Sequence, residues 1–170
     1  MYDIFALSVA AIGFILLIIL SVIDFKTYLL PNKYVFPFAG LGVLFHFLSD
    51  FYLLDLTGVL LGGAVGYGVL YLIRAAGNHY YEQDSLGLGD VKLLGAGGLW
   101  LGMEGVLMAM TIGAFLGLCF GFAVALYKKV KNSEKFSLAR LTIPAGPGFA
   151  VAIIIVFAWN YYPFILRTFS

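Results

Sequence analysis

Charge and cysteine are both scarce in this chain. Only 11% of its 170 residues are Asp, Glu, Lys or Arg, whereas about a quarter are charged in an ordinary soluble domain. Hydrophobic residues make up 62% of the sequence and the mean hydropathy is +1.01, which excludes a soluble globular protein. The single cysteine, Cys119, cannot form a disulfide within the chain, and a cysteine-built zinc site is excluded as well. No basic surface suited to nucleic acid is apparent, so no nucleic-acid partner is expected.

Long apolar runs without charges mark the segments that cross the membrane. These runs predict an all-α polytopic membrane protein with six transmembrane helices, at 4–24, 35–49, 56–74, 89–103, 105–127 and 142–166. The second run is short, and the fourth is the weakest, so a re-entrant segment is its alternative. Nothing indicates a second domain, and residues 1–170 are expected to form one membrane-embedded unit. The first residues lack the basic region of a cleaved signal peptide, so we expect the first span to be retained.

The distribution of basic residues predicts the orientation of the chain. With six crossings, every Lys and Arg except Arg167 lies on one side of the membrane. Cytoplasmic loops carry the excess of Lys and Arg, so that side is the cytoplasm and both termini lie outside the inner (plasma) membrane. A re-entrant fourth segment would put the lysine-rich loop 128–140 outside, against this rule. Asp24 and Asp90 then lie at the same, cytoplasmic, level.

These two aspartates are the residues most suggestive of function. Asp24 follows the uncharged run 4–23, and Asp90 ends the sequence Gly-Leu-Gly-Asp at 87–90. A carboxylate at the edge of a span is costly to desolvate, which favours a functional interpretation. The Leu-Leu-Pro-Asn turn at 29–32 should end the first helix, because proline disfavours helix at the residue before it, and this places Asp24 near the last turn. Two carboxylates that share a proton are the chemistry of an aspartyl protease.

The glycines beside Asp90 fit the same chemistry. Gly87 and Gly89 allow close backbone approach and unusual dihedral angles near a substrate. A peptide bond inside a membrane helix is hidden from water, so an intramembrane protease must unwind its substrate and admit water at the carboxylates. A glycine-rich turn next to an aspartate meets that need.

The two regions resemble the signature motifs of type IV prepilin peptidases, a family of GxGD-type aspartyl proteases. The resemblance rests on Asp24 with Leu30-Pro31-Asn32, on residues 87–94 through 100–102, and on the proline-glycine stretch 143–148. It covers nearly the whole chain. It implies a membrane endopeptidase that removes the short basic leader of prepilins or pseudopilins at the cytoplasmic face, usually after a glycine, in type IV pilus assembly or protein secretion. Asp24 and Asp90 match the catalytic aspartates.

The resemblance also suggests supporting residues and shows departures from the family pattern. Supporting or substrate-binding roles are expected for Gly87, Gly89, Lys92, Asp84 and Pro31. Asp84 stands where the family usually has a glutamate, and its alternative role is that of a solvated loop acid. Lys92 has an alternative role as a cytoplasmic anchor. Many relatives carry an N-terminal region with four cysteines that binds zinc, and many N-methylate the new terminus. This chain resembles the short form, so no metal and no cofactor are expected, and N-methyltransferase activity is left open.

The sequence leaves other interpretations of the two aspartates open. Asp24 could be a helix-end residue paired with Lys26 or Lys33, and Asp90 could be an interfacial helix cap. Among whole-protein alternatives, a relative of presenilin or signal peptide peptidase also uses GxGD. A small cation- or proton-coupled transporter could use the same two carboxylates. The partners expected are prepilin or pseudopilin substrates and membrane lipid, and the sequence does not predict the oligomeric state.

Three further patterns predict packing rather than chemistry. His46, toward the outer end of the second span, is expected to be structural. Small-xxx-small spacing predicts close helix contacts at two sets of glycines, Gly62 with Gly66 and Gly113 with Gly117 and Gly121. An aromatic belt at the outer interface is predicted from Trp159, Tyr161 and Tyr162.

Overall fold

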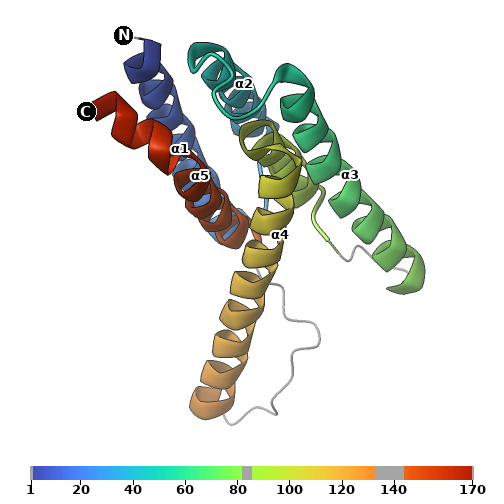
Figure 1. The fold of residues 1–170 in the computed structure, drawn as a ribbon. Helices are drawn as coiled ribbons and strands as arrows, with labels where there is room; N and C mark the ends of the chain where they lie inside the picture. The colour runs from blue at the N-terminus through green and yellow to red at the C-terminus, as the bar shows by residue number, and fades with distance from the viewer. Residues whose placement is uncertain (1, 82–85, 133–143, 170) are drawn as a thin grey trace.

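The computed structural model describes residues 2–81, 86–132 and 144–169, and its described part is helical without a strand. It contains five helices, α1 (Tyr2–Thr27), α2 (Asn32–Leu48), α3 (Leu56–Tyr81), α4 (Leu88–Asn132) and α5 (Gly146–Phe169), as Figure 1 shows. Away from their ends, helices satisfy their backbone hydrogen bonds internally, which a chain in lipid requires. The prediction of an all-α membrane fold is therefore confirmed.

Helix α4 is two helical arms joined at Gly102. The first arm (residues 88–101) and the second arm (residues 103–132) meet at a glycine with φ 71° and ψ −178°, a backbone conformation open essentially to glycine alone. The two arms run in opposite directions (Figure 1). They correspond to the fourth and fifth predicted spans, which the sequence analysis separated at residue 104.

Four of the helices are long and apolar enough to cross a membrane, namely α1, α3, α4 and α5. Helix α2 has 17 residues and is shorter than the usual span of about 20. Helix α4 is counted once among these four, although it consists of two arms. Six crossings therefore stay a prediction. Six helical segments are nevertheless present, because α2 adds one to the four and the division of α4 at Gly102 adds another.

Trp100 holds the first arm of α4 in the centre of the bundle. Its side chain is 1% exposed, and its indole Nε1 donates a hydrogen bond of 2.9 Å to the carbonyl oxygen of Phe38 on α2. The indole also stacks on the Phe38 ring, with 5.4 Å between ring centroids. A Cβ at Gly13 on α1 or at Gly42 on α2 would lie under 3 Å from the indole, so both glycines make room for it.

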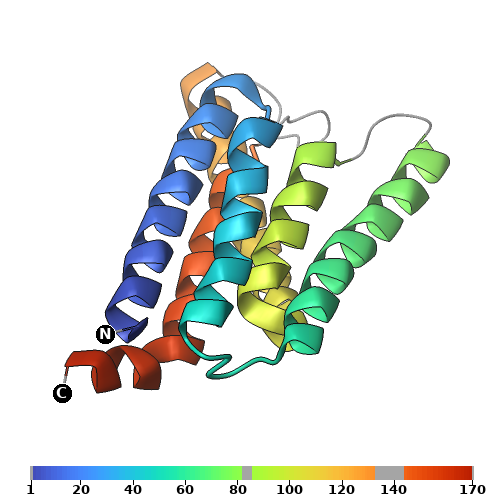
Figure 2. The ribbon, with the colours of Figure 1, turned by 90° about the horizontal axis from the view of Figure 1, so that it is seen from above.

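Glycines also set the contact between α3 and α4. A Cβ at Gly62 or at Gly98 would overlap the backbone of the opposite helix, which is the close approach that small residues permit. The predicted packing roles of Gly62, Gly66 and Gly113 are confirmed, because a Cβ at each would collide with a neighbouring helix. A Cβ at Gly117 would meet nothing within 4 Å, although α5 passes close by, since a Cβ at Gly148 would lie 3.6 Å from the Gly117 amide nitrogen. Helix α3 packs on α4 at one edge of the bundle (Figure 2).

Tyr161 departs from the predicted aromatic belt. It is 1% exposed and stacks on Phe157, whereas Trp159 and Tyr162 are 77% and 60% exposed. The Tyr161 hydroxyl lies 3.5 Å from Nδ1 of His46, which is fully buried. One face of α5 turns inward and carries Tyr161 with it, so His46 and Tyr161 form a polar contact inside an aromatic cluster.

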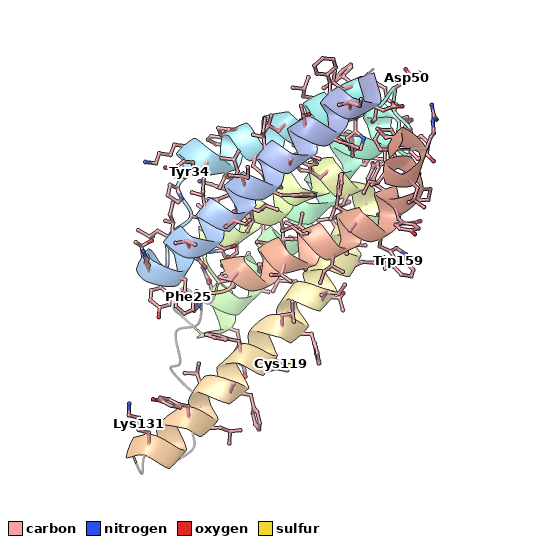
Figure 3. The ribbon with its side chains drawn as sticks, turned by 90° about the vertical axis from the view of Figure 1, so that its left-hand side faces the viewer. Phe25, Tyr34, Asp50, Cys119, Lys131 and Trp159 are labelled. Atoms are coloured by element: carbon pink, nitrogen blue, oxygen red, sulfur yellow. The ribbon has the colours of Figure 1, made fainter. Side chains whose placement is uncertain are left out.

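The two ends of the bundle carry different sequence regions. Phe25 and Tyr34 lie toward one end, and Asp50 and Trp159 toward the other (Figure 3). Both chain termini lie near the end that holds Asp50, as Figures 1 and 3 together show, and Arg167 Nη2 is 4.0 Å from Asp3 Oδ2. The end with Phe25 holds the two aspartates.

Candidate active site

Asp24 lies in the last turn of α1, as predicted. Helix α1 ends at Thr27, and the next residue, Tyr28, has a φ of 56°. The Tyr28 amide donates a hydrogen bond of 2.8 Å to the carbonyl oxygen of Asp24. Helices commonly end in such a left-handed residue, but it is usually glycine, so a tyrosine here is strained.

The Asp24 carboxylate is held by the beginning of another helix. It is 5% exposed, and its Oδ2 accepts a hydrogen bond of 2.9 Å from the amide of Gly146, the first residue of α5. The first amides of a helix lack partners within the helix and carry partial positive charge, so they attract a carboxylate. Lys26 and Lys33, the partners in the alternative interpretation, form no ion pair with Asp24 among the described residues.

Asp90 lies in the first turn of α4, facing the same space. Its amide donates a hydrogen bond of 3.2 Å to the carbonyl oxygen of Gly87, and its side chain is 8% exposed. Its Oδ1 is buried and has no hydrogen-bond partner among the described residues. A buried oxygen without a hydrogen-bond partner is uncommon in folded proteins. It suits a carboxylate that must bind a water molecule or a substrate. Asp24 and Asp90 are close enough to interact electrostatically.

The two glycines of the Gly-Leu-Gly-Asp sequence make space rather than unusual backbone angles. A Cβ at Gly87 would lie 2.9 Å from Oδ2 of Asp90, and a Cβ at Gly89 would lie 2.8 Å from Cβ of Leu30. Gly87 therefore leaves room for the carboxylate, and Gly89 lets the two motif regions touch. Neither glycine has a positive φ, while the predicted close approach of the backbone is confirmed.

A cavity of about 460 Å³ lies between the two motif regions. Its lining comes from the end of α1, the turn before α2 and the start of α4: Asp24, Tyr28, Leu29, Leu30, Pro31, Asn32, Gly87, Leu88, Gly89, Asp90 and Lys92. Both aspartates therefore face one cavity at one end of the bundle. Lys92 Nζ donates a hydrogen bond of 3.1 Å to Oδ1 of Asn32, which connects α4 to α2 beside the carboxylates.

The structure brings the predicted site residues together, with one exception. Asp24, Asp90, Gly87, Gly89, Lys92 and Pro31 all line this cavity. Asp84 lies outside the described residues. In the described part of the chain, no three His, Cys, Asp or Glu side chains form a group that could hold a metal ion.

Two residues of the site had no role in the sequence analysis. Gly146 stands in the proline-glycine stretch 143–148, which was noticed only as a likeness to a family. Its contact with Asp24 spans 122 positions of the chain and could not be inferred from spacing. Tyr28 gave no signal at all, because a left-handed backbone conformation at a tyrosine cannot be read from its side chain.

A family profile described as the type IV leader peptidase family matches residues 11–122, which include both aspartates. The chain belongs to this family. The prediction of the family from the two motif regions is thereby confirmed, and the apolar helices indicate a multi-pass membrane protein.

Individual relatives agree with this assignment. The chain is 32% identical to a prepilin leader peptidase/N-methyltransferase of Escherichia coli over 152 residues, which are 88% of this chain and 63% of that protein. It is 33% identical to leader peptidase HopD of Salmonella typhimurium over 147 residues, covering 85% of this chain and 88% of that protein. A prepilin leader peptidase/N-methyltransferase of Xanthomonas campestris is 33% identical over 144 residues, but the match covers only 47% of it. No solved structure matches the chain.

Proposed function

We propose that this chain is an aspartyl endopeptidase that removes the leader of prepilins or pseudopilins. The observation that supports it best is the meeting of Asp24 and Asp90, which are far apart in sequence, at one half-enclosed cavity in a leader peptidase family member. Both carboxylates are buried, yet the cavity between them has room for water and a peptide segment.

The geometry supports a mechanism in which the two aspartates share one proton. The ionised carboxylate takes a proton from a water molecule, whose oxygen attacks the carbonyl carbon of the scissile peptide bond. The protonated carboxyl donates its proton to the carbonyl oxygen as the tetrahedral intermediate forms. Collapse of the intermediate breaks the C–N bond, and a proton passes to the departing amine. The two aspartates titrate as a pair, so neither role is assigned to one residue.

The rest of the site would serve to position these groups. The Gly146 amide fixes one oxygen of Asp24, and Gly87 leaves space beside Asp90. Pro31 and Gly89 shape the wall of the cavity, and Lys92 connects that wall to α4 through Asn32.

We place the cavity on the cytoplasmic side of the inner membrane, with both termini outside. The positive-inside distribution of Lys and Arg supports this orientation. Lys131, in the last turn of α4, lies beyond the end of the bundle that holds Phe25 (Figure 3). A basic leader would then remain in the cytoplasm while the apolar part of the substrate stays in the membrane.

The direct test is cleavage of a purified prepilin by the purified protein in liposomes. We expect a product shortened by the leader, identified by mass spectrometry of both fragments. A transporter that uses the same carboxylates would instead give proton or cation flux into the liposomes and leave the prepilin whole. That combination of results would overturn the proposal.

A further inference from the structure

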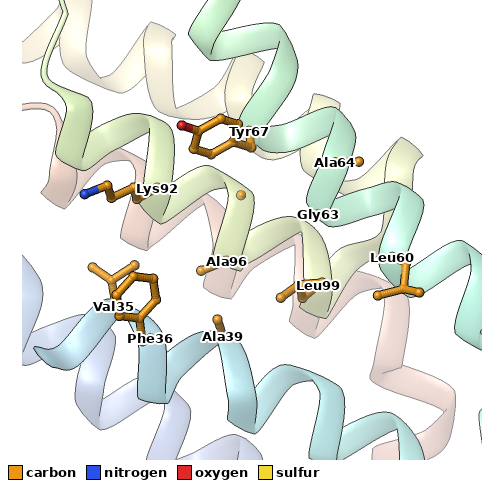
Figure 4. Close-up of a pocket in the computed structure, with 11 residues that line it drawn as sticks. Val35, Phe36, Ala39, Leu60, Gly63, Ala64, Tyr67, Lys92, Ala96 and Leu99 are labelled. Carbon is orange, nitrogen blue, oxygen red and sulfur yellow. The ribbon is translucent and has the colours of Figure 1, made fainter. Parts of the chain in front are cut away.

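A membrane-facing groove begins beside the aspartates and lies outside the cavity that the aspartates line. Helices α2 and α3 both flank the first arm of α4 and leave a groove of about 320 Å³ between them (Figure 4). Its lining is apolar apart from the Lys92 ammonium and the Tyr67 hydroxyl: Val35, Phe36, Ala39, Leu60, Gly63, Ala64, Tyr67, Lys92, Gly95, Ala96 and Leu99. Phe36, Leu60 and Tyr67 are 63%, 55% and 42% exposed, so the groove opens sideways.

We infer that this groove receives the apolar helix of the prepilin substrate, on the mature side of the cleaved bond. The inference rests on the proposed function, because it gives that reaction its substrate-binding surface. The expected occupant is a substrate helix, not a lipid chain or a second copy of this protein.

Continuity with the cavity supports this occupant. Lys92 lines both the groove and the cavity that contains Asp24 and Asp90. A polypeptide that lies in the groove can therefore reach the carboxylates without crossing a helix, past the hydrogen bond between Lys92 and Asn32. From Lys92 to Leu99 the first arm rises about 10 Å, so the groove can accommodate roughly two turns of a substrate helix.

The shape of the groove also suits a helix. Its floor and walls include Ala39, Gly63, Ala64, Gly95 and Ala96, and such small residues let helices approach closely in lipid. Ala39 of α2 and Ala96 of α4 point toward one another in Figure 4, and both are free of bulky atoms beyond Cβ.

Charge indicates which side of the substrate occupies the groove. Its one charged lining group is the ammonium of Lys92, at the end nearest the aspartates. A basic leader would be repelled there and poorly solvated among apolar side chains. The apolar mature segment has neither difficulty, so the leader is left to extend from the cavity toward water.

A second apolar groove provides an internal comparison. It has a volume of about 250 Å³ and lies among α1, the second arm of α4 and α5, with Phe25, Gly117 and Val151 in its lining. It shares no lining residue with the cavity of the aspartates. We therefore expect substrate contacts in the groove of Ala39 and not in that of Gly117.

The test compares three tryptophan variants with the wild type on a membrane-anchored prepilin. Ala39→Trp fills the proposed groove, Leu44→Trp adds an indole elsewhere on α2 at an exposed position outside the described cavities, and Gly117→Trp fills the second groove. We expect Ala39→Trp to raise KM about tenfold or more with kcat nearly unchanged, because it removes binding shared by ground and transition states. The other two variants should keep the wild-type KM.

Cross-linking supplies a measurement that does not depend on the fold of a bulky variant. Cys119 is replaced by serine, Asp90 by asparagine to prevent turnover, and a single cysteine is placed at Ala39 or at Leu44. A prepilin with one cysteine in the first two turns of its apolar helix should form a disulfide with Ala39→Cys and not with Leu44→Cys.

The outcomes separate this inference from the proposed function. If the wild type cleaves prepilin but Ala39→Trp has an unchanged KM and Ala39→Cys forms no cross-link, the groove does not bind substrate and the peptidase assignment stands. A raised KM for Gly117→Trp alone, or cross-linked enzyme dimers at Ala39→Cys in place of the substrate adduct, would also overturn it. If the wild type cleaves no prepilin, the proposed function itself fails.

Discussion

Replacing Gly146 with alanine tests how the protein positions Asp24. In the structure, a Cβ at Gly146 would lie 2.7 Å from Oδ2, 3.0 Å from Cγ and 3.2 Å from Cβ of Asp24. Ordinary contacts of a Cβ begin at 3.4 Å, so the carboxylate or the start of α5 must move by about 0.7 Å. The carboxylate would then lose its alignment with the Gly146 amide.

The expected effect is a loss of rate with little loss of stability. Displacing a catalytic group by about 1 Å can lower the rate about 100-fold, so we expect kcat to fall between about 10- and 100-fold. Alanine is a better helix former than glycine by roughly 1 kcal/mol within a helix, which offsets part of the crowding. The thermal unfolding temperature should therefore change by only a few degrees.

The assay measures kcat for prepilin cleavage together with thermal unfolding in the same detergent. Gly68→Ala is the matched control, because a Cβ at Gly68 meets nothing within 4 Å. It should retain wild-type kcat. A Gly146→Ala protein with wild-type kcat would refute the reasoning that this close contact fixes the position of Asp24.

Three other predictions concern the scaffold. Gly62→Ala should lower the free energy of unfolding by about 1–3 kcal/mol, because its Cβ overlaps the backbone of α4. Gly68→Ala on the same helix should leave that free energy unchanged, and chemical denaturation in detergent measures both variants. Trp100→Ala should cost about 3–5 kcal/mol in the same measurement, since it leaves a cavity at the centre of the bundle; a change below 1 kcal/mol would mean that the indole does not hold the helices together. A cysteine at Lys131 in a Cys119→Ser background should react with an impermeant maleimide only from the cytoplasm, and one at Asp50 only from outside; labelling of both from the same face would contradict six crossings.

The parts of the fold that follow from local sequence were predictable. Charge-free apolar runs located the helices, since lipid leaves a spanning chain few alternatives. Proline at position 31 and the turn before it ended α1 close to Asp24, as expected. The sequence did not reveal that Gly102 joins two antiparallel arms without a loop, because the decisive property is its backbone conformation of φ 71° and ψ −178°.

Contacts between distant segments were the parts that could not be predicted. The spacing of Gly113 and Gly117 is the same as that of Gly62 and Gly66, yet a Cβ would collide with a neighbouring helix at Gly113 and meet nothing within 4 Å at Gly117. Tyr161 looks like an interfacial tyrosine by sequence, but the inward face of α5 buries it against His46. Such outcomes depend on how helices turn about their axes, which packing determines.

In the candidate site, too, local motifs were predictable and contacts between distant segments were not. The motifs identified both aspartates and four of the residues around them, all of which line one cavity. The Gly146 amide that binds Asp24 became visible only when α5 was placed beside α1.

The central claim is that Asp24 and Asp90 act as one catalytic pair, and the most direct test is cleavage of prepilin by Asp24→Asn and Asp90→Asn. Asparagine keeps the shape of the side chain but cannot take up and release the shared proton. Each variant should insert into the membrane and unfold at nearly the wild-type temperature, while kcat falls more than about 1,000-fold. Near-normal cleavage by either variant would contradict the account.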